Sequence, residues 1–141
     1  MGVLEELPML FAPPEIIKTE VFAEVPYALR KVNEPCERGA RAAGCSLEGP
    51  SFDRAGNLYF VDSFYGRVFR ASPRGDVEVV ADYDGEPNGL KIHRDGRIFL
   101  ADFKNGIMLL DAASGKVTRV VSRYQTEHFK GVNDLTFAGN G

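Results

Sequence analysis

Short runs rich in apolar residues, separated by glycine-bearing turns, dominate the chain from residue 49 onward. Residues 58–62 read LYFVD and residues 67–71 read RVFRA, and the turns "DRAGN", "SFYG" and "SPRGD" lie between such runs. Short runs bounded by glycine, proline and aspartate are typical of strands joined by tight turns. The pattern predicts four strands, at 49–52, 58–62, 67–71 and 77–82. No segment here has the 3.6-residue apolar period of a helix, so the predicted fold class is all-β.

The same pattern returns forty residues later. Residues 48–80 align with residues 88–120 without a gap, and a third copy starts at "NDLTFAGNG", residues 133–141. The second copy has the turns "HRDGR", "FKNG" and "AASGK". A period of about forty residues that carries four strands is typical of β-propeller blades, whereas solenoid repeats of this period are helical. Identical aligned pairs include Gly49 and Gly89, Gly56 and Gly96, Asp62 and Asp102, and Gly66 and Gly106.

The repeat predicts about two blades of a β-propeller and the first strand of a third. The expected units are an N-terminal segment at 1–44 and a partial propeller at 45–141, with blades at 48–85 and 86–131 and a third blade starting at 132–141. Within the N-terminal segment, "TEVFAEVP" at 19–26 is typical of the extra strand that closes a propeller ring. Two stacked blades leave strand edges and an apolar face uncovered, which predicts self-association or poor folding.

Polar residues recur at the start of the first strand in each copy. In a propeller this strand lies innermost, so Glu48, Asn88 and Asn133 are expected to point toward a common axis. Carboxylate and amide oxygens are the ligands that Ca²⁺ and Mg²⁺ prefer. The flanking Gly49 and Gly89 permit close backbone approach. The alternative is that these side chains line a channel and hydrogen-bond to water.

Composition excludes several classes of partner. The formal net charge is -3, and Lys and Arg are scattered among acidic residues, which argues against nucleic acid. No stretch has the length of a membrane span and the N-terminus does not resemble a signal peptide, so we expect no membrane association and a cytoplasmic location. Cys36 and Cys45 lack the further ligands of a zinc site; reduced thiols are favoured over a disulfide, and neither is assigned chemistry.

The motifs "LEGPSFDRAGNLYFVD", "EPNGLKIHRDGRIFLAD" and "RYQTEHFKGVNDLTFAGNG" resemble the gluconolactonase and senescence marker protein (regucalcin) family. Members of that family are six-bladed propellers that hydrolyse sugar lactones with a bound divalent cation. The resemblance covers residues from about 45 to 141. It implies that Glu48 and Asn133 are metal ligands and that Asn88 binds substrate beside the metal or completes its shell. The implied partners are a small-molecule lactone and Ca²⁺, with Zn²⁺, Mn²⁺ and Mg²⁺ as alternatives.

The chain departs from the family pattern in two places. Glu86 lies where some relatives carry an arginine that holds the substrate, so the substrate preference is expected to differ. The family also has a further aspartate, a metal ligand and proton-transfer residue, in a later blade. Six blades of about forty residues need about 240 residues, so the catalytic acid is expected beyond residue 141. Two functions stay open: a metal-dependent lactonase in complete form, and a non-catalytic propeller fragment whose bound ion stabilises a binding or interaction domain.

Other candidate residues are assigned to the scaffold. Asp62 and Asp102 are expected to cap turns, and Asp134 is expected to point away from the axis and bond the neighbouring turn. His93 is expected in an exposed turn. His128 lies in the loop before the third inner strand, where a catalytic role is the less favoured alternative. The strand aromatics expected in the core are Tyr59, Phe60, Phe69 and Phe99.

Overall fold

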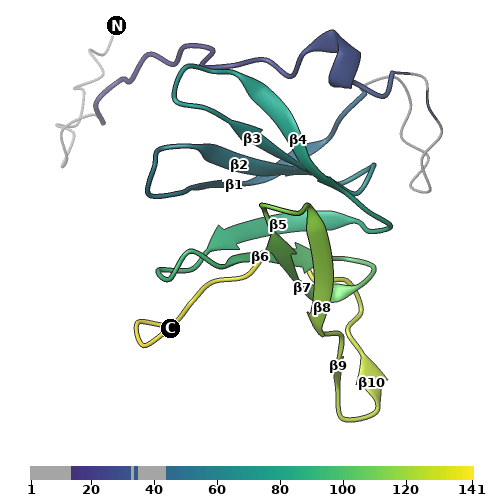
Figure 1. Ribbon diagram of the computed structural model, residues 1–141. Helices are drawn as coiled ribbons and strands as arrows, with labels where there is room; N and C mark the ends of the chain where they lie inside the picture. Colours follow the sequence, from purple (N-terminus) through teal and green to yellow (C-terminus); the bar gives the residue numbers. More distant parts are fainter. Residues whose placement is uncertain (1–13, 33, 35–43) are drawn as a thin grey trace, which may run out of the picture.

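The computed structural model describes residues 14–32, 34 and 44–141 and contains two antiparallel sheets of four strands each (Figure 1). In each sheet the strands follow one another in chain order. The first sheet consists of β1 (Leu47–Phe52), β2 (Leu58–Asp62), β3 (Arg67–Ala71) and β4 (Val77–Asp82). The second consists of β5 (Pro87–Ile92), β6 (Ile98–Asp102), β7 (Gly106–Asp111) and β8 (Lys116–Val121). A two-stranded hairpin, β9 (Arg123–Tyr124) and β10 (Glu127–His128), and a short 3-10 turn, η1 (Tyr27–Leu29), complete the described elements.

The all-β prediction is confirmed, and the predicted strands of the first unit are nearly identical to those observed. The second, third and fourth strands have the predicted bounds, while β1 begins two residues earlier, at Leu47. The turn glycines explain why the boundaries could be found. Gly56, Gly75 and Gly96 all have positive φ, which other residues adopt only with strain. No helix among the described residues is long and apolar enough to cross a membrane.

The two sheets pack face to face through alternate residues of their strands. Successive side chains of a strand point to opposite faces, so Tyr59 and Val61 of β2 enter the core between the sheets while Phe60 enters a second cluster on the other face. Tyr59, Phe60 and Phe69 are buried as predicted, and the rings of Phe60 and Phe69 stack at 5.3 Å. Phe99 is half-buried and its ring contacts Phe137 at 5.4 Å. The core between the sheets comprises Tyr59, Val61, Val68, Ala81, Leu90, Ile98, Leu100, Met108 and Leu110.

The three copies of the repeat have equivalent turns. A guanidinium N–H of Arg54 donates to Arg94 O at 2.6 Å, and Arg94 in turn donates to Asn140 O at 3.1 Å, so each turn is tied to the next. Residues 133–138 carry no strand, because the described chain supplies no neighbouring strand of a third sheet to pair with them. In all three copies the glycine N–H donates to the carbonyl three residues earlier: Gly56 to Asp53 (3.2 Å), Gly96 to His93 (2.8 Å) and Gly141 to Ala138 (2.9 Å).

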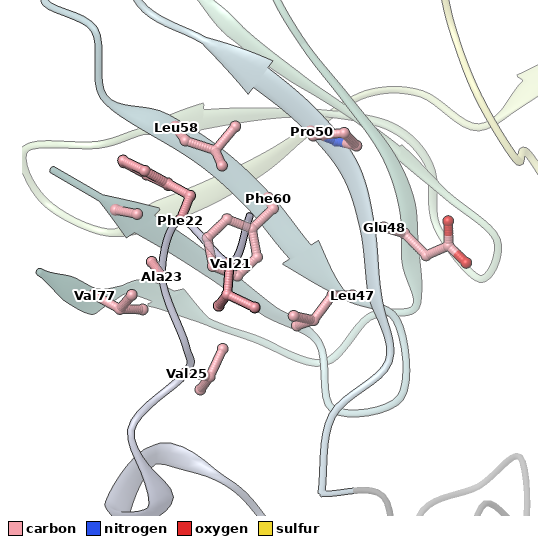
Figure 2. Close-up of a pocket in the computed structure, with 11 residues that line it drawn as sticks. Val21, Phe22, Ala23, Val25, Leu47, Glu48, Pro50, Leu58, Phe60 and Val77 are labelled. Carbon is pink, nitrogen blue, oxygen red and sulfur yellow. The ribbon is translucent and has the colours of Figure 1, made fainter. Parts of the chain in front are cut away.

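The N-terminal segment lies along the first sheet on the face opposite to the second sheet. Residues 19–26, predicted as a ring-closing strand, carry no strand and belong to neither four-stranded sheet. The segment and the sheet enclose an apolar groove of about 310 Å³ (Figure 2). Its lining includes Val21, Val25, Leu47 and Phe60.

Candidate functional site

The first strands of successive copies approach each other through two glycines. A Cβ atom at Gly49 would lie 2.5 Å from Leu90 N and 2.9 Å from Gly89 C. A Cβ atom at Gly89 would lie 2.9 Å from Asn133 O and 2.7 Å from Asp134 Oδ1. Real Cβ atoms do not approach other atoms this closely, so both positions require glycine. The predicted close backbone approach at Gly49 and Gly89 is confirmed, and residues 48–49, 88–89 and 133–134 form three adjacent backbone segments.

Each segment carries one of the candidate site residues. Glu48 is exposed and pairs with Val61 in the β1–β2 register, so its side chain shares the face of Val61 that is turned toward the second sheet. Figure 2 shows its carboxylate pointing away from the apolar groove. Asn88 is half-buried at a bulge between Pro87 and Gly89, and Asn133 is exposed. No described residue forms a side-chain hydrogen bond or ion pair with Glu48, Asn88 or Asn133, so their oxygens are available to a ligand.

The donor set fits part of the shell of a hard cation. One carboxylate and two amides offer only oxygen ligands, as Ca²⁺ and Mg²⁺ prefer. The described residues contain no group of three His, Cys, Asp or Glu side chains that could hold a metal ion. A single negative charge gives a weak calcium site, because affinity depends on the number of charged ligands.

Asp134 binds the neighbouring strand, where the sequence predicted a bond to a turn. Its Oδ1 lies 3.5 Å from Lys91 Nζ of β5 and accepts a hydrogen bond from Leu135 N–H at 2.8 Å. This carboxylate is therefore paired, and it anchors the segment that carries Asn133 to β5. Comparison of the repeat copies could not reveal the Lys91 pair, since the corresponding residue of the first copy is Ser51.

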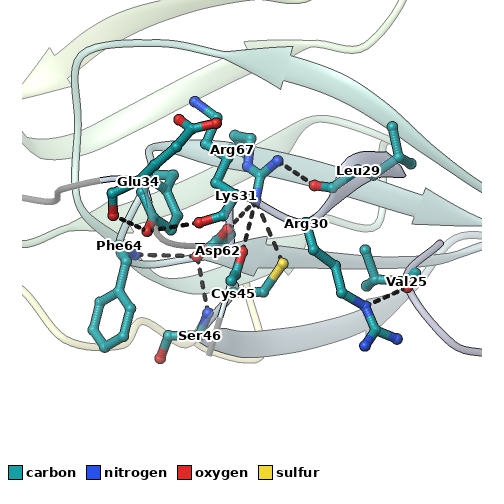
Figure 3. A network of polar contacts seen from close by, with 12 residues as sticks. Val25, Leu29, Arg30, Lys31, Glu34, Cys45, Ser46, Asp62, Phe64 and Arg67 are labelled. Carbon is teal, nitrogen blue, oxygen red and sulfur yellow. Dashed lines mark hydrogen bonds and ion pairs between the residues drawn. The ribbon is translucent and has the colours of Figure 1, made fainter. Parts of the chain in front are cut away.

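Asp62 caps a turn, as predicted, and in addition forms a buried ion pair (Figure 3). Its Oδ1 accepts from the N–H groups of Ser46 (3.0 Å) and Phe64 (3.2 Å), and its Oδ2 lies 2.6 Å from Arg67 Nη2. The Asp62 and Arg67 side chains are 0% and 4% exposed. Arg67 also donates to Leu29 O at 2.6 Å, so the pair ties the N-terminal segment to the hairpin of β2 and β3. Sequence comparison of the copies missed Arg67 because Ile107 takes its place in the second copy.

Asp102 is the equivalent cap of the second copy and has a neutral partner. Its Oδ1 accepts from Lys104 N–H at 2.9 Å and Asn105 N–H at 2.8 Å. Its Oδ2 accepts from Tyr83 O–H at 2.7 Å and Glu86 N–H at 3.1 Å. Burial, followed by the nearby charge of Asp102, raises the pKa of Tyr83 well above its usual range. The hydroxyl therefore stays protonated and fixes the loop that leads to Asn88.

Cys45, His93 and His128 lie outside the site formed by residues 48–49, 88–89 and 133–134. Cys45 is half-buried with Sγ 3.4 Å from Arg67 Nη2, and burial, aided by the charge of Asp62, raises its thiol pKa. Cys36 lies outside the described residues. The prediction of an exposed His93 is wrong: its side chain is 11% exposed, because its ring packs edge-on against Phe137 at 4.8 Å and its Nδ1 pairs with Asp95 at 2.8 Å. His128 is exposed in β10.

Comparison with known proteins supports the resemblance seen in the motifs. The model of the SMP-30/Gluconolactonase/LRE-like region matches residues 47–141, which is more than half of the chain. Lactonase drp35 from Staphylococcus epidermidis is 32% identical over 106 residues, which are 70% of this chain and 32% of that protein. The Staphylococcus saprophyticus lactonase drp35 is 34% identical over 105 residues, with the same coverage.

A solved structure has a similar fold. It is a gluconolactonase from Xanthomonas campestris, and it matches with a TM-score of 0.63 and 26% identity over 69% of this chain and 33% of that one. The chain thus spans about a third of the length of these relatives. With the motifs, the paired sheets and the family model in agreement, the chain belongs to the SMP-30/gluconolactonase/LRE-like family.

Proposed function

We propose that this chain forms part of a divalent-cation-dependent lactonase that opens a sugar-type lactone. The observation that carries the proposal is the contact of three successive segments through Gly49 and Gly89, with an oxygen-bearing side chain beside each contact. The relatives support the reaction class, since those reported above are a gluconolactonase and lactonases by name.

The proposed roles follow from the donor atoms. Glu48 and Asn133 would hold the cation, with Ca²⁺ as the proposed ion, and Asn88 would bind an oxygen of the lactone or complete the shell. A bound divalent cation polarises a carbonyl or lowers the pKa of a bound water. Glu48 supplies the single negative charge of this set, and a carboxylate that holds a cation is a poor proton acceptor. The proton-transfer acid is therefore proposed to lie outside the three residues.

The architecture proposed for the whole unit is a β-propeller. In it the first sheet belongs to a blade at 48–85, the second to a blade at 86–131, and residues 132–141 begin a third. Supporting this, the copies have the same turn geometry and adjacent turns are linked by Arg54 and Arg94. Residues 19–26 would then add an outer strand to a further sheet lying over the apolar groove.

A lactone hydrolysis assay tests the proposal. Hydrolysis of a gluconolactone-type substrate by the complete lactonase of which this chain is proposed to form part is followed with Ca²⁺, Mn²⁺ or Zn²⁺ and after chelation, for the wild type and for Glu48→Gln. Glu78→Gln serves as the control, because Glu78 is an exposed carboxylate of the first sheet that is paired with Arg70. We expect cation-dependent turnover that Glu48→Gln removes and Glu78→Gln retains. Turnover that needs no cation and tolerates Glu48→Gln contradicts the proposal, and cation binding without turnover favours a non-catalytic binding domain.

A further inference from the structure

The segment that leads from β8 to Asn133 rests on an aromatic side chain. It first forms the β9–β10 hairpin, whose base is closed by Phe129 N–H donating to Ser122 O at 2.9 Å. It then turns at Gly131, which has φ +91°. A Cβ atom at Gly131 would lie 2.7 Å from Cδ2 and 2.8 Å from Cζ of Phe103. The Gly131 backbone therefore lies directly on the Phe103 ring.

Phe103 lies in a turn that several hydrogen bonds hold in place. The preceding Asp102 accepts two backbone N–H groups of this turn through its Oδ1, and Phe103 N–H donates to Glu86 O at 2.9 Å. Pro87 pairs with Asp102 in the β5–β6 register, so the turn lies at the same end of the second sheet as Asn88. The ring is thus held at the end of the sheet that carries the candidate site.

The same segment is held a second time just beyond Gly131. Asn133 O and Asp134 Oδ1 lie against Gly89, at the distances that exclude a Cβ atom there. Residues 129–138 carry no strand, so no backbone ladder to a described strand sets the position of Asn133. The contacts nearest to Asn133 are the one at Gly131 and those of Asn133 and Asp134 with β5, while Phe137, further along the segment, packs against His93 and Phe99.

We propose that Phe103 is a positioning residue for Asn133: its ring supports Gly131 and so holds Asn133 beside Asn88. The inference rests on the proposed function, in which Asn133 is a cation ligand, and Phe103 itself does not touch the cation. Removal of the ring abolishes the support. A methyl group at position 131 also abolishes it, because either the segment is lifted or the half-exposed ring is displaced. Both changes remove one contact, so their effects should not add.

Cation affinity tests the proposal through a double-mutant cycle. Mn²⁺ binding to the full chain is measured by calorimetry for Phe103→Ala, Gly131→Ala and the double variant. Substitution of a residue that orients a metal ligand typically lowers the metal affinity by about 10- to 100-fold. We expect about a tenfold loss in each single variant and no further loss in the double variant.

Two control variants separate positioning from a general loss of stability. Gly96→Ala introduces a methyl group at φ +95° with no atom within 4 Å, so it matches the backbone strain of Gly131→Ala without a clash. Phe103→Tyr keeps the ring. Both should keep wild-type affinity. Wild-type affinity in Phe103→Ala and Gly131→Ala would overturn the positioning role and leave the proposed function intact.

A measurement made without any cation distinguishes a failure of the positioning role of Phe103 from a failure of the proposed function. The nuclear Overhauser effect between the α-protons of Gly89 and Asp134 reports whether the segment keeps its place on β5. We expect this signal to weaken in Phe103→Ala and Gly131→Ala and to persist in Gly96→Ala. If the wild type binds no Mn²⁺, the proposed function fails and this signal alone decides the inference: its persistence in all variants overturns it.

Discussion

Asp62 and Asp102 hold equivalent places in two copies of the repeat, but substitution by asparagine should cost different amounts of stability. Asp62 Oδ2 faces Arg67 Nη2 at 2.6 Å, and both side chains are buried. Asp62→Asn removes the negative charge, so Arg67 stays buried without its counter-charge. The amide NH2 of the new side chain must also face donors, either the guanidinium or the N–H groups of Ser46 and Phe64. Loss of one partner of a buried ion pair typically costs about 3 to 5 kcal/mol. That is a large part of the 5 to 15 kcal/mol, roughly, that keeps a domain folded.

Asp102→Asn leaves no buried cation behind. The Tyr83 hydroxyl can rotate to accept a hydrogen bond from the new amide, so only Glu86 N–H loses its acceptor. Hydrogen bonds to charged groups contribute about 1.5 to 3 kcal/mol each. We therefore expect Asp102→Asn to destabilise the chain by about 1.5 to 3 kcal/mol, less than Asp62→Asn.

Urea unfolding at pH 7, followed by circular dichroism, measures both changes in one protein. The comparison is made between variants whose unfolding transitions have the same steepness, so that midpoints report stability. A cost below about 1 kcal/mol for Asp62→Asn, the level of an exposed ion pair, would refute the reasoning. So would an equal or larger cost for Asp102→Asn.

Three further predictions concern the core, the buried tyrosine and the uncovered face. Leu100→Ala should lower the free energy of unfolding by about 2 to 5 kcal/mol, because Leu100 is fully buried between the sheets, whereas the exposed Val120→Ala should change it by less than about 0.5 kcal/mol. Tyr83 has a raised pKa in the folded state, so its hydroxyl contributes its full stabilisation below about pH 10, the usual tyrosine pKa, and this contribution is lost as the pH rises further. The difference in unfolding free energy between the wild type and Tyr83→Phe, measured by urea unfolding, should therefore shrink above that pH. A difference that stays constant with pH would contradict this prediction. Self-association through the apolar groove is expected to make the sedimentation coefficient rise with protein concentration, and Leu47→Glu, which places a charge in that groove, should reduce this rise in sedimentation velocity experiments. An unchanged rise would show that another surface is responsible.

The sequence predicted those features of the fold that are encoded locally and repeated. Strand limits at 58–62, 67–71 and 77–82 could be found because each is bounded by a turn with its own glycine, and the observed bounds are the same. The close approach at Gly49 and Gly89 was predictable for the same reason, since an identical residue recurs at the same place in both copies. A glycine that recurs at the same place in both copies is a stronger indication of a required backbone geometry than a glycine that occurs once.

Contacts made by residues that occur in only one copy of the repeat could not be predicted from the sequence. Arg67 and Tyr83 each complete the hydrogen bonds of a turn aspartate, yet neither has a counterpart of the same type forty residues away. The burial of His93 depends on Phe137, a residue 44 positions later that no periodic pattern connects to it. The support of Gly131 by Phe103 is likewise a contact between segments far apart in the sequence.

The most direct test of the account is a titration of the isotope-labelled chain with Mn²⁺, monitored through the side-chain amide signals of its asparagines. Paramagnetic Mn²⁺ broadens signals close to the ion. A cation held between the three segments should broaden Asn88 and Asn133 together, while Asn57 and Asn140, in turns bonded to Asp53 and Arg94, stay sharp. Glu48→Gln should restore both signals. Broadening of Asn88 and Asn133 at different Mn²⁺ concentrations, or of all four amides alike, would contradict a shared cation site.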